Sequence, residues 1–454
     1  MLRNGASIHP KLEGRRLARD EFVWATASSD MRPESWSRAV APGRYIAMPS
    51  ISYRLARIAA GDGVATASIH SVNEYDIAAG AALVRAAGGE MLDASGQEIV
   101  FCGAPDARVS GCFAGAPEAA LQLARFDWTT LEQEPKRAPR VMVGFPRPAD
   151  DARLSRAQGC LLGQLIGDSL GSRVEFKSAA DIARAYPAGV RDLADGGTWN
   201  TIAGQPTDDS ELALALARSI VAHRGYDAPA AAQAYREWLD SQPFDVGATT
   251  RRGIRGDPDL ASEANGSLMR ISPLGVWAAG EPERAASAAR EDSMLTHPNP
   301  VCVDACGAFA AAISVGVAGG SREEMVRAAQ AEARAASVRR AIDHGTSGEL
   351  PGDFVKHQGW VLIALQNAFF RLCSGASAEE GIIATVGCGG DTDTNAAIAG
   401  ALLGAAEGRG AFPSRWVYAL LACRPLAAAG AKRPRPSTYW PDDAFDLAEA
   451  LLKK

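Results

Sequence analysis

The segment Gly387-Cys388-Gly389-Gly390-Asp391-Thr392-Asp393-Thr394-Asn395 is the clearest guide to how this 454-residue chain folds, and it runs directly into a small-residue stretch at 396–404. Glycines permit strained backbone angles, and acidic side chains are favoured at a helix N-terminus. The segment therefore predicts an acidic first turn on a buried helix. Clustered carboxylates and hydroxyls are the hard oxygen ligands that Mg²⁺ or Mn²⁺ prefers. Taken alone, the pattern equally fits side chains that only cap the helix.

A second segment of the same design lies far upstream. Pro206-Thr207-Asp208-Asp209-Ser210-Glu211 precedes the apolar run 212–217. Two such clusters meeting in a core would be very unfavourable without cations between them, because unpaired buried carboxylates are poorly solvated and repel one another. The two segments together predict one binuclear metal site.

The chain from Leu154 onward has a helical texture, with long segments rich in Ala and Leu that include 156–170, 267–279, 321–341 and 395–407. Helices with so much Ala and Gly pack closely, so residues 153–454 are expected to form a compact, orthogonal, all-α domain. Glycines recur at every fourth position of 158–171. We expect them to form a face that another helix approaches at backbone distance.

Residues 1–128 differ in texture. Short strand-like segments at 21–25 and 99–103 alternate with helix-like runs at 51–60 and 77–87, which indicates a small α/β unit. A polar, proline-punctuated passage at 129–152 predicts a linker. The expected fold is therefore multidomain, with an α/β unit ahead of the helical domain.

The bulk composition excludes some classes of protein. A net charge of −6 and a sequence pI near 5.7 argue against a general nucleic-acid or membrane-surface binder. The N-terminus lacks the apolar run of a secretion signal, and uninterrupted apolar stretches stay below the roughly 20 residues of a membrane span. Eight cysteines without a CxxC pair are typical of reduced side chains, which predicts a cytoplasmic protein.

An ordered set of motifs over about 154–420 resembles the ADP-ribosylglycohydrolases. Within that family the likeness is greatest to the dinitrogenase reductase-activating branch, through 242–247, 251–255 and 359–369. The motifs that carry the resemblance are the glycine-spaced helix with Glu175, Thr207-Asp208-Asp209, Asp245-Val246-Gly247, Asn265-Gly266-Ser267-Leu268-Met269-Arg270, Thr296-His297-Pro298 and Gly389-Gly390-Asp391-Thr392-Asp393-Thr394.

The resemblance implies a role for each matching residue. Glu175 matches an acid at the mouth of the metal site, and Asp245 matches an acid that faces the ribose. Asn265, Gly266 and Ser267 match a loop whose backbone amides meet the pyrophosphate, and His297 matches a histidine that lines the ADP-ribose cleft. The ligands to a pair of Mg²⁺ or Mn²⁺ ions would be Thr207, Asp208, Asp209, Asp391, Asp393 and Thr394.

The resemblance also implies an activity. A metal-dependent hydrolase would remove ADP-ribose from a modified side chain, with arginine the expected acceptor and Asp245 or Glu175 as acid or base. The substrate would be an ADP-ribosylated protein or small molecule, and a nucleic acid is not excluded. The alternative is a non-catalytic module that binds ADP-ribose or serves a structural role. Both carboxylate clusters are complete here, which favours the enzyme.

Residues in 1–128 resemble the C-terminal half of the inositol monophosphatase family, through Tyr75-Asp76-Ile77-Ala78-Ala79-Gly80, the segment 50–61 and the segment 86–90. In that family the acid matching Asp76 is a metal ligand, but residues 1–75 supply none of the other ligands. We therefore predict a non-catalytic half-domain. Its exposed edge would be covered by the neighbouring domain or by another subunit, which would make the protein an oligomer.

Ordinary structural roles also fit these residues. Glu175 could pair with Arg173 or Lys177 on a surface turn, Asp245 could form a turn, and His297 could cap a helix. Asn265-Gly266 is a common turn in any protein.

Overall fold

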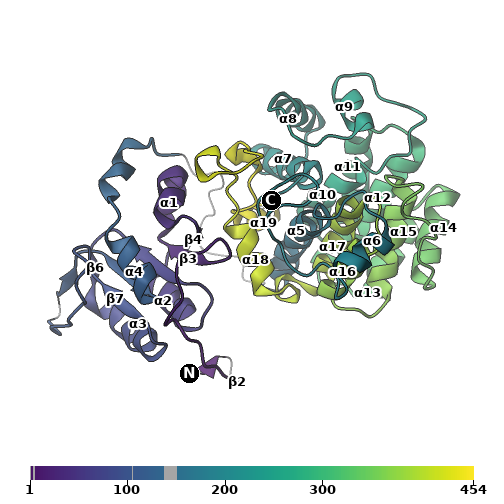
Figure 1. Ribbon diagram of the computed structural model, residues 1–454. Helices are drawn as coiled ribbons and strands as arrows, with labels where there is room; N and C mark the ends of the chain where they lie inside the picture. The colour runs from purple at the N-terminus through teal and green to yellow at the C-terminus, as the bar shows by residue number, and fades with distance from the viewer. Residues whose placement is uncertain (1, 4–5, 105, 138–150, 454) are drawn as a thin grey trace. The chain divides into compact units, whose positions relative to one another are not determined.

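The computed structural model describes residues 2–3, 6–104, 106–137 and 151–453. The chain divides into two compact units (Figure 1). The N-terminal unit comprises residues 1–139 with 426–431, and the helical unit comprises 140–425 with 432–454. Most of the predicted linker, residues 138–150, lies outside the described residues, so the linker stays a prediction.

The N-terminal unit is built on a five-stranded sheet in the order β4-β3-β5-β9-β7. Strand β3 is parallel to β4 and β5, whereas β9 is antiparallel to β5 and β7. The strands are β3 (Phe22–Ala25), β4 (Arg44–Ala47), β5 (Ala65–Ser68), β7 (Glu90–Leu92) and β9 (Cys112–Gly115). Two-stranded pairs are formed by β1 (Leu2–Arg3) with β2 (Ala6–Ser7) and by β6 (Val72–Asn73) with β8 (Arg108–Val109).

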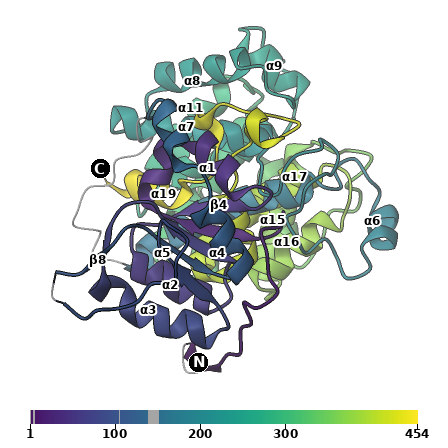
Figure 2. The ribbon, with the colours of Figure 1, turned by 60° about the vertical axis from the view of Figure 1, so that its left-hand side comes forward.

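Helices complete this unit. They are α1 (Pro33–Val40), α2 (Ile51–Ala59), α3 (Glu74–Ala86) and α4 (Pro117–Ala124). Helices α2 and α3 lie against each other in both views (Figure 2). The strand expected at 21–25 and the helices expected at 51–60 and 77–87 are confirmed by β3, α2 and α3. The α/β character of this part of the chain is confirmed with them.

The strand expected at 99–103 is wrong, because these residues belong to no strand. The carboxylate of Glu74 accepts hydrogen bonds from the amides of Cys102 and Gly103. Those amides are therefore paired with a side chain rather than with a neighbouring strand.

The helical unit contains α5 and the helices that follow it in the chain, as expected for an all-α domain. They are α5 (Asp151–Gly171), α6 (Ala179–Ala185), α7 (Asp208–His223), α8 (Ala228–Asp240), α9 (Ala248–Ile254), α10 (Ser272–Trp277), α11 (Pro282–Met294), α12 (Pro300–Val317), α13 (Arg322–Glu332), α14 (Ala336–Thr346), α15 (Val361–Cys373), α16 (Ala378–Val386), α17 (Thr392–Glu407), α18 (Ser414–Leu421) and α19 (Ala444–Leu452). Short 3₁₀ turns, such as Leu268–Arg270, join some of them.

Helices α5 and α17 form the centre of this unit and pack along much of their length. The glycines spaced by four on α5 meet the small residues of α17, as the spacing predicts. A Cβ atom added to Gly163 would overlap the carbonyl oxygen of Gly400, and one added to Gly167 would overlap that of Ala396. Backbone therefore lies directly on backbone, and this contact fixes the N-terminus of α17 beside the C-terminus of α5.

One long expected helix, 321–341, is two helices. Helix α13 ends at Glu332 and α14 begins at Ala336. The carboxylate of Asp304, on α12, accepts hydrogen bonds from the amides of Arg334 and Ala335. These two amides are therefore not available to continue α13 into α14.

Helix α12 is long and apolar enough to cross a membrane by length and composition, but 78% of it is buried inside the protein. It packs against α11 and α13 as a core helix.

Candidate active site

Three buried carboxylates from three helices meet where α5, α7 and α17 converge. One oxygen each of Asp168, Asp209 and Asp393 lies within 4.8 Å of the others. Asp168 comes from the last turn of α5, and the other two come from the first turns of α7 and α17. The predicted convergence of acids far apart in the sequence is therefore a feature of the structure.

A second group shares one of these acids. Oxygens of Glu175, Asp391 and Asp393 also lie within 4.8 Å of one another, and all three residues are buried. Glu175 follows the end of α5, and Asp391 is the N-cap of α17. Asp393 thus belongs to both groups, which is the arrangement expected when one carboxylate lies between two cations.

Asp168 was not predicted as a site residue. Its side chain is fully buried, and its carboxylate accepts hydrogen bonds from the amide and hydroxyl of Thr207 and from the amide of Ser210. These bonds fix the N-terminal turn of α7, so the carboxylate holds the neighbouring Asp208 and Asp209 in position. A single acid on a glycine-spaced helix gives no sequence signal of this role beyond its burial.

Burial and mutual repulsion shape the charge state of these acids in the metal-free protein. Burial, followed by the charges of Glu175 and Asp209, raises the pKa of Asp393 well above its usual range. Burial, followed by the charges of Asp168 and Asp208, raises the pKa of Asp209 in the same way. The Oδ1 atom of Asp209 is buried without a hydrogen-bond partner. An orphaned buried carboxylate oxygen facing other acids fits a bound cation.

Asp208 and Asp245 lie together at one side of this cluster. Asp208 accepts a hydrogen bond of 3.2 Å from the amide of Gly247 and shares another with the Asp245 side chain. Burial, followed by the charge of Asp208, raises the pKa of Asp245 to about 10. The carboxylate of Asp245 therefore lies next to that of Asp208, which a turn-forming role alone would not require.

The predicted loop Asn265-Gly266-Ser267 reaches the cluster through its first member. The Nδ2 atom of Asn265 donates to Oδ2 of Asp391 at 2.7 Å, and both residues are buried. The hydroxyl of Ser267 is buried and accepts a hydrogen bond from Ser293 at 2.9 Å. The Ser267 hydroxyl is therefore paired within the protein.

His297 is buried beside this loop rather than capping a helix. Its Nδ1 atom pairs with the Thr296 hydroxyl at 2.8 Å, and its Nε2 atom is buried without a partner. Burial, followed by the charge of Arg270, lowers the pKa of His297 to about 3. The ring is therefore neutral, and a Cβ atom added to Gly266 would meet its Nε2 at 2.8 Å.

Arg270 contacts this loop and is itself held in place by Asp292. They form a fully buried ion pair at 3.0 Å, and Arg270 also donates to the carbonyl oxygen of Gly266. Sequence reasoning included Arg270 only as the end of a motif and did not assign it this supporting contact.

Glu175 is held by an aromatic residue and not by a neighbouring cation. The indole N–H of Trp199 donates to its carboxylate at 2.6 Å, whereas Arg173 donates to the carbonyl oxygen of Asp192. Burial, followed by the charge of Asp391, raises the pKa of Glu175 to about 8.

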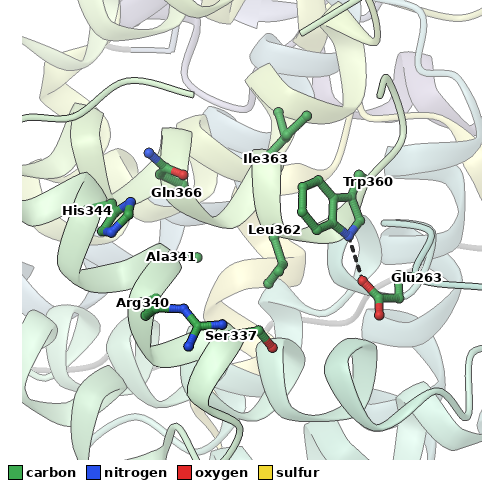
Figure 3. A pocket seen from close by; sticks show the side chains of 9 residues that line it. All are labelled: Glu263, Ser337, Arg340, Ala341, His344, Trp360, Leu362, Ile363 and Gln366. Carbon is green, nitrogen blue, oxygen red and sulfur yellow. Dashed lines mark hydrogen bonds between the residues drawn. The ribbon is translucent and has the colours of Figure 1, made fainter. Parts of the chain in front are cut away.

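A separate pocket opens between α14 and α15 (Figure 3). The Trp360 indole donates to Glu263 at 2.7 Å on one wall, and His344 and Gln366 lie on the other side of the pocket. No predicted site residue lines it.

The raised pKa of Glu175 predicts a pH effect on stability. Between about pH 4.5 and 8 the folded, metal-free chain keeps a proton on Glu175 that the unfolded chain has released, so raising the pH through this window lowers the free energy of unfolding. Urea unfolding in EDTA across this range should show that fall, and Glu175→Gln should show a shallower one. Equal slopes for the two proteins would contradict the assignment.

Comparisons with known proteins match both parts of the chain to protein families. Residues 149–451 match the family model described as ADP-ribosylglycohydrolase, and residues 18–126 match that of the inositol monophosphatase family. The ADP-ribosyl-dinitrogen reductase glycohydrolase of Rhodospirillum rubrum is 31% identical over 58% of this chain and 90% of its own length. An ADP-ribosylarginine hydrolase of Pseudomonas putida (strain GB-1) is 28% identical over 66% of this chain and 85% of its own length.

Two further relatives extend the comparison. The ADP-ribosylhydrolase ARH3 of Bos taurus is 26% identical over 58% of this chain and 88% of its own length. The solved structure of an ADP-ribosylglycohydrolase-related protein complex is 29% identical and aligns with a TM-score of 0.54, covering 66% of this chain and 98% of that one.

Proposed function

This chain belongs to the ADP-ribosylglycohydrolase family, and from that membership we propose that it is a metal-dependent hydrolase that removes ADP-ribose from modified arginine side chains. Membership of this family indicates a hydrolase that cleaves an ADP-ribosyl bond. The similarity to an ADP-ribosylarginine hydrolase supports arginine as the acceptor.

The chain's own residues fit a pair of divalent cations. The observation that carries the proposal is that two groups of buried acids share Asp393 while Oδ1 of Asp209 has no partner. Such a cluster is unfavourable unless positive charge lies among the acids. The residues that would hold two Mg²⁺ or Mn²⁺ ions are Thr207, Asp208, Asp209, Asp391, Asp393 and Thr394, with Asp168 positioning the first turn of α7.

Bound divalent cations supply Lewis-acid contacts to ribose hydroxyls and lower the pKa of bound water. In the reaction, the oxygen of water bonds to the anomeric carbon and the carbon–nitrogen bond breaks with its electron pair on nitrogen. One proton of the water ends on that nitrogen. Glu175, held by Trp199 at 2.6 Å, relays this proton, and Asp245 orients the ribose. Relay by a positioned carboxylate contributes about a hundredfold in rate.

The nucleotide part of the substrate lies along the Asn265-Gly266-Ser267 loop in this proposal. The backbone amides of the loop face the pyrophosphate, and the neutral His297 lies beside the loop with its unpartnered Nε2. Asn265 links this loop to the acids through Asp391.

The test is incubation of ADP-ribosylarginine and of an arginine-modified protein with Mg²⁺ or Mn²⁺, in parallel with EDTA. We expect free ADP-ribose only in the metal samples. Tight binding of the modified arginine without any release would instead identify a non-catalytic binding module. Release at equal rates with and without EDTA would contradict the metal requirement.

We propose that the N-terminal unit has no catalytic role. Among its described residues, no three Asp, Glu, His or Cys side chains meet within 4.8 Å, whereas the helical unit contains two such groups. Asp76, the one acid that matches a phosphatase ligand, accepts a hydrogen bond of 3.3 Å from Asn73 instead.

Asp76→Asn is therefore expected to leave ADP-ribose release unchanged within about twofold, because both acid groups belong to the helical unit and Asp76 belongs to neither. The measurement is kcat/KM of the full chain on ADP-ribosylarginine, with phosphate release from inositol monophosphate measured on the same samples. A large loss in the first assay, or any phosphate release that the substitution removes, would disprove the assignment.

A further inference from the structure

Three aromatic side chains form a rim beside the acid cluster, and the proposed mechanism uses only the indole N–H of one of them and none of their ring faces. They are Phe176, Trp199 and Phe244, which we call the aromatic rim. The rings of Phe176 and Trp199 lie 6.5 Å apart in an edge-to-face arrangement, and those of Trp199 and Phe244 lie 6.0 Å apart. Such contacts hold the rings in a fixed relation to one another.

The rim adjoins the two carboxylates proposed to relay the proton and to orient the ribose. Phe176 follows Glu175 directly in the chain, and Phe244 directly precedes Asp245. Trp199 donates to Glu175 at 2.6 Å. The loop proposed for the pyrophosphate reaches the cluster from a different element, through Asn265 and Asp391. The rim is therefore placed for the leaving group and not for the nucleotide.

Phe176 is held outward at a conformational cost. Its side chain is 55% exposed, and its φ of +66° lies in the left-handed region, which non-glycine residues rarely adopt. The backbone is fixed there because the Phe176 amide donates to the Gly390 carbonyl oxygen at 2.8 Å, next to Asp391. A large exposed aromatic residue in strained backbone contributes little to folding, which points to a role in binding.

The rim already accepts one guanidinium group of the chain itself. The guanidinium carbon of Arg433 lies 5.9 Å from the centre of the Phe244 ring, while its Nε donates to the carbonyl oxygen of Trp199 at 3.0 Å. Arg433 therefore shows how a planar cation lies against one ring of the rim, and aromatic rings attract cations through their faces.

We propose that the aromatic rim is the acceptor subsite of this enzyme and binds the guanidinium of the modified arginine, which makes Phe176 and Phe244 determinants of acceptor specificity. This inference rests on the proposed function. The guanidinium stacks on the rim while the buried acids beside it complement its charge. An acceptor that is neither planar nor cationic, such as a serine hydroxyl, gains nothing from these ring faces.

The test compares two ligands on the full chain loaded with Mg²⁺. The variants Phe176→Leu and Phe244→Leu keep apolar bulk but lose the ring. We expect the KM for ADP-ribosylarginine to rise about tenfold in each, because the cation–ring attraction is lost from bound substrate and transition state alike. The affinity for ADP-ribose, which lacks the acceptor, should stay within twofold, and Phe176→Tyr and Phe244→Tyr should restore the wild-type KM.

Phe370→Leu is the matched control. Phe370 also has a guanidinium over its ring, that of Arg371 at 5.1 Å, but it lies near the far end of α15, about 13 Å along the helix from Val361. Its KM should equal that of the wild type. An unchanged KM in both rim variants would overturn the proposal, as would a loss of ADP-ribose affinity as large as the rise in KM.

The two proposals fail separately. If the wild type released no ADP-ribose, the proposed function would fall. Calorimetry of ADP-ribosylarginine and ADP-ribose on the same protein would still decide whether the rim favours the arginine-bearing ligand and whether the leucine variants lose that preference.

Discussion

Asp393→Asn is expected to reduce ADP-ribose release by about a thousandfold, since the loss of charge stabilisation by bound cations amounts to several kcal/mol. Asp393 is the one carboxylate common to both acid groups, so its replacement weakens both cation sites at once. Asparagine keeps the shape and can still accept the hydrogen bond that the Thr394 amide gives to Oδ1 at 3.0 Å. The measurement is kcat/KM on ADP-ribosylarginine in saturating Mg²⁺.

The same substitution should not weaken the metal-free fold. In the wild type the neighbouring charges of Glu175, Asp209 and Asp391 oppose ionisation of Asp393, and a neutral amide removes that repulsion. The free energy of unfolding in EDTA is therefore expected to equal or exceed that of the wild type. Activity near the wild-type level would contradict the metal assignment. A large loss of stability in EDTA would show that the carboxylate has a structural role instead.

Gly163→Ala is expected to destabilise the helical unit by about 4 kcal/mol or to prevent its folding. An alanine here would gain about 1 kcal/mol of helix propensity, so an exposed site would be stabilised. At Gly163 the added methyl group overlaps the carbonyl oxygen of Gly400 and also meets the Phe412 ring at 2.9 Å. Backbone on the α17 side cannot rotate away as a side chain can, so the two helices must separate.

Gly410→Ala is the matched control, because nothing lies within 4 Å of a Cβ atom added at Gly410. Urea unfolding of both variants and the wild type gives the comparison. We also expect Gly163→Ala to lose activity in any fraction that folds, since α5 carries Asp168 and α17 carries Asp393. A Gly163→Ala protein as stable as the control would disprove the close packing of α5 on α17.

The parts of the site that are local in sequence could be predicted. Acids and hydroxyls at 207–209 and 391–394 stand next to apolar helices, and a helix N-terminus is recognisable from such a pattern. The glycine spacing on α5 likewise indicated a face for close helix packing, and Gly400 and Ala396 meet it.

What could not be predicted depends on tertiary contacts. Asp168 is a lone acid in an apolar helix, and its role appears only when α7 places Thr207 and Ser210 against it. The link from Asn265 to Asp391 joins loops 126 positions apart. Trp199 was not singled out because its hydrogen bond to Glu175 is made by a loop that carries no motif.

The errors in secondary structure have the same origin. The alanine-rich run at 321–341 reads as one helix, but the carboxylate of Asp304 binds the amides of Arg334 and Ala335 and ends it. The apolar run at 99–103 reads as a strand, but the carboxylate of Glu74 accepts hydrogen bonds from the amides of Cys102 and Gly103. In both cases a distant side chain competes with the backbone pairing that local preference favours.

The central claim is that acids at the starts of α7 and α17 bind a pair of divalent ions. Equilibrium dialysis of EDTA-stripped full chain against Mn²⁺, followed by metal analysis, tests it most directly. We predict two Mn²⁺ per wild-type chain and fewer than one in Asp393→Asn, because both acid groups include Asp393. Absence of tight Mn²⁺ binding by the wild type, or full binding by the variant, would contradict the account.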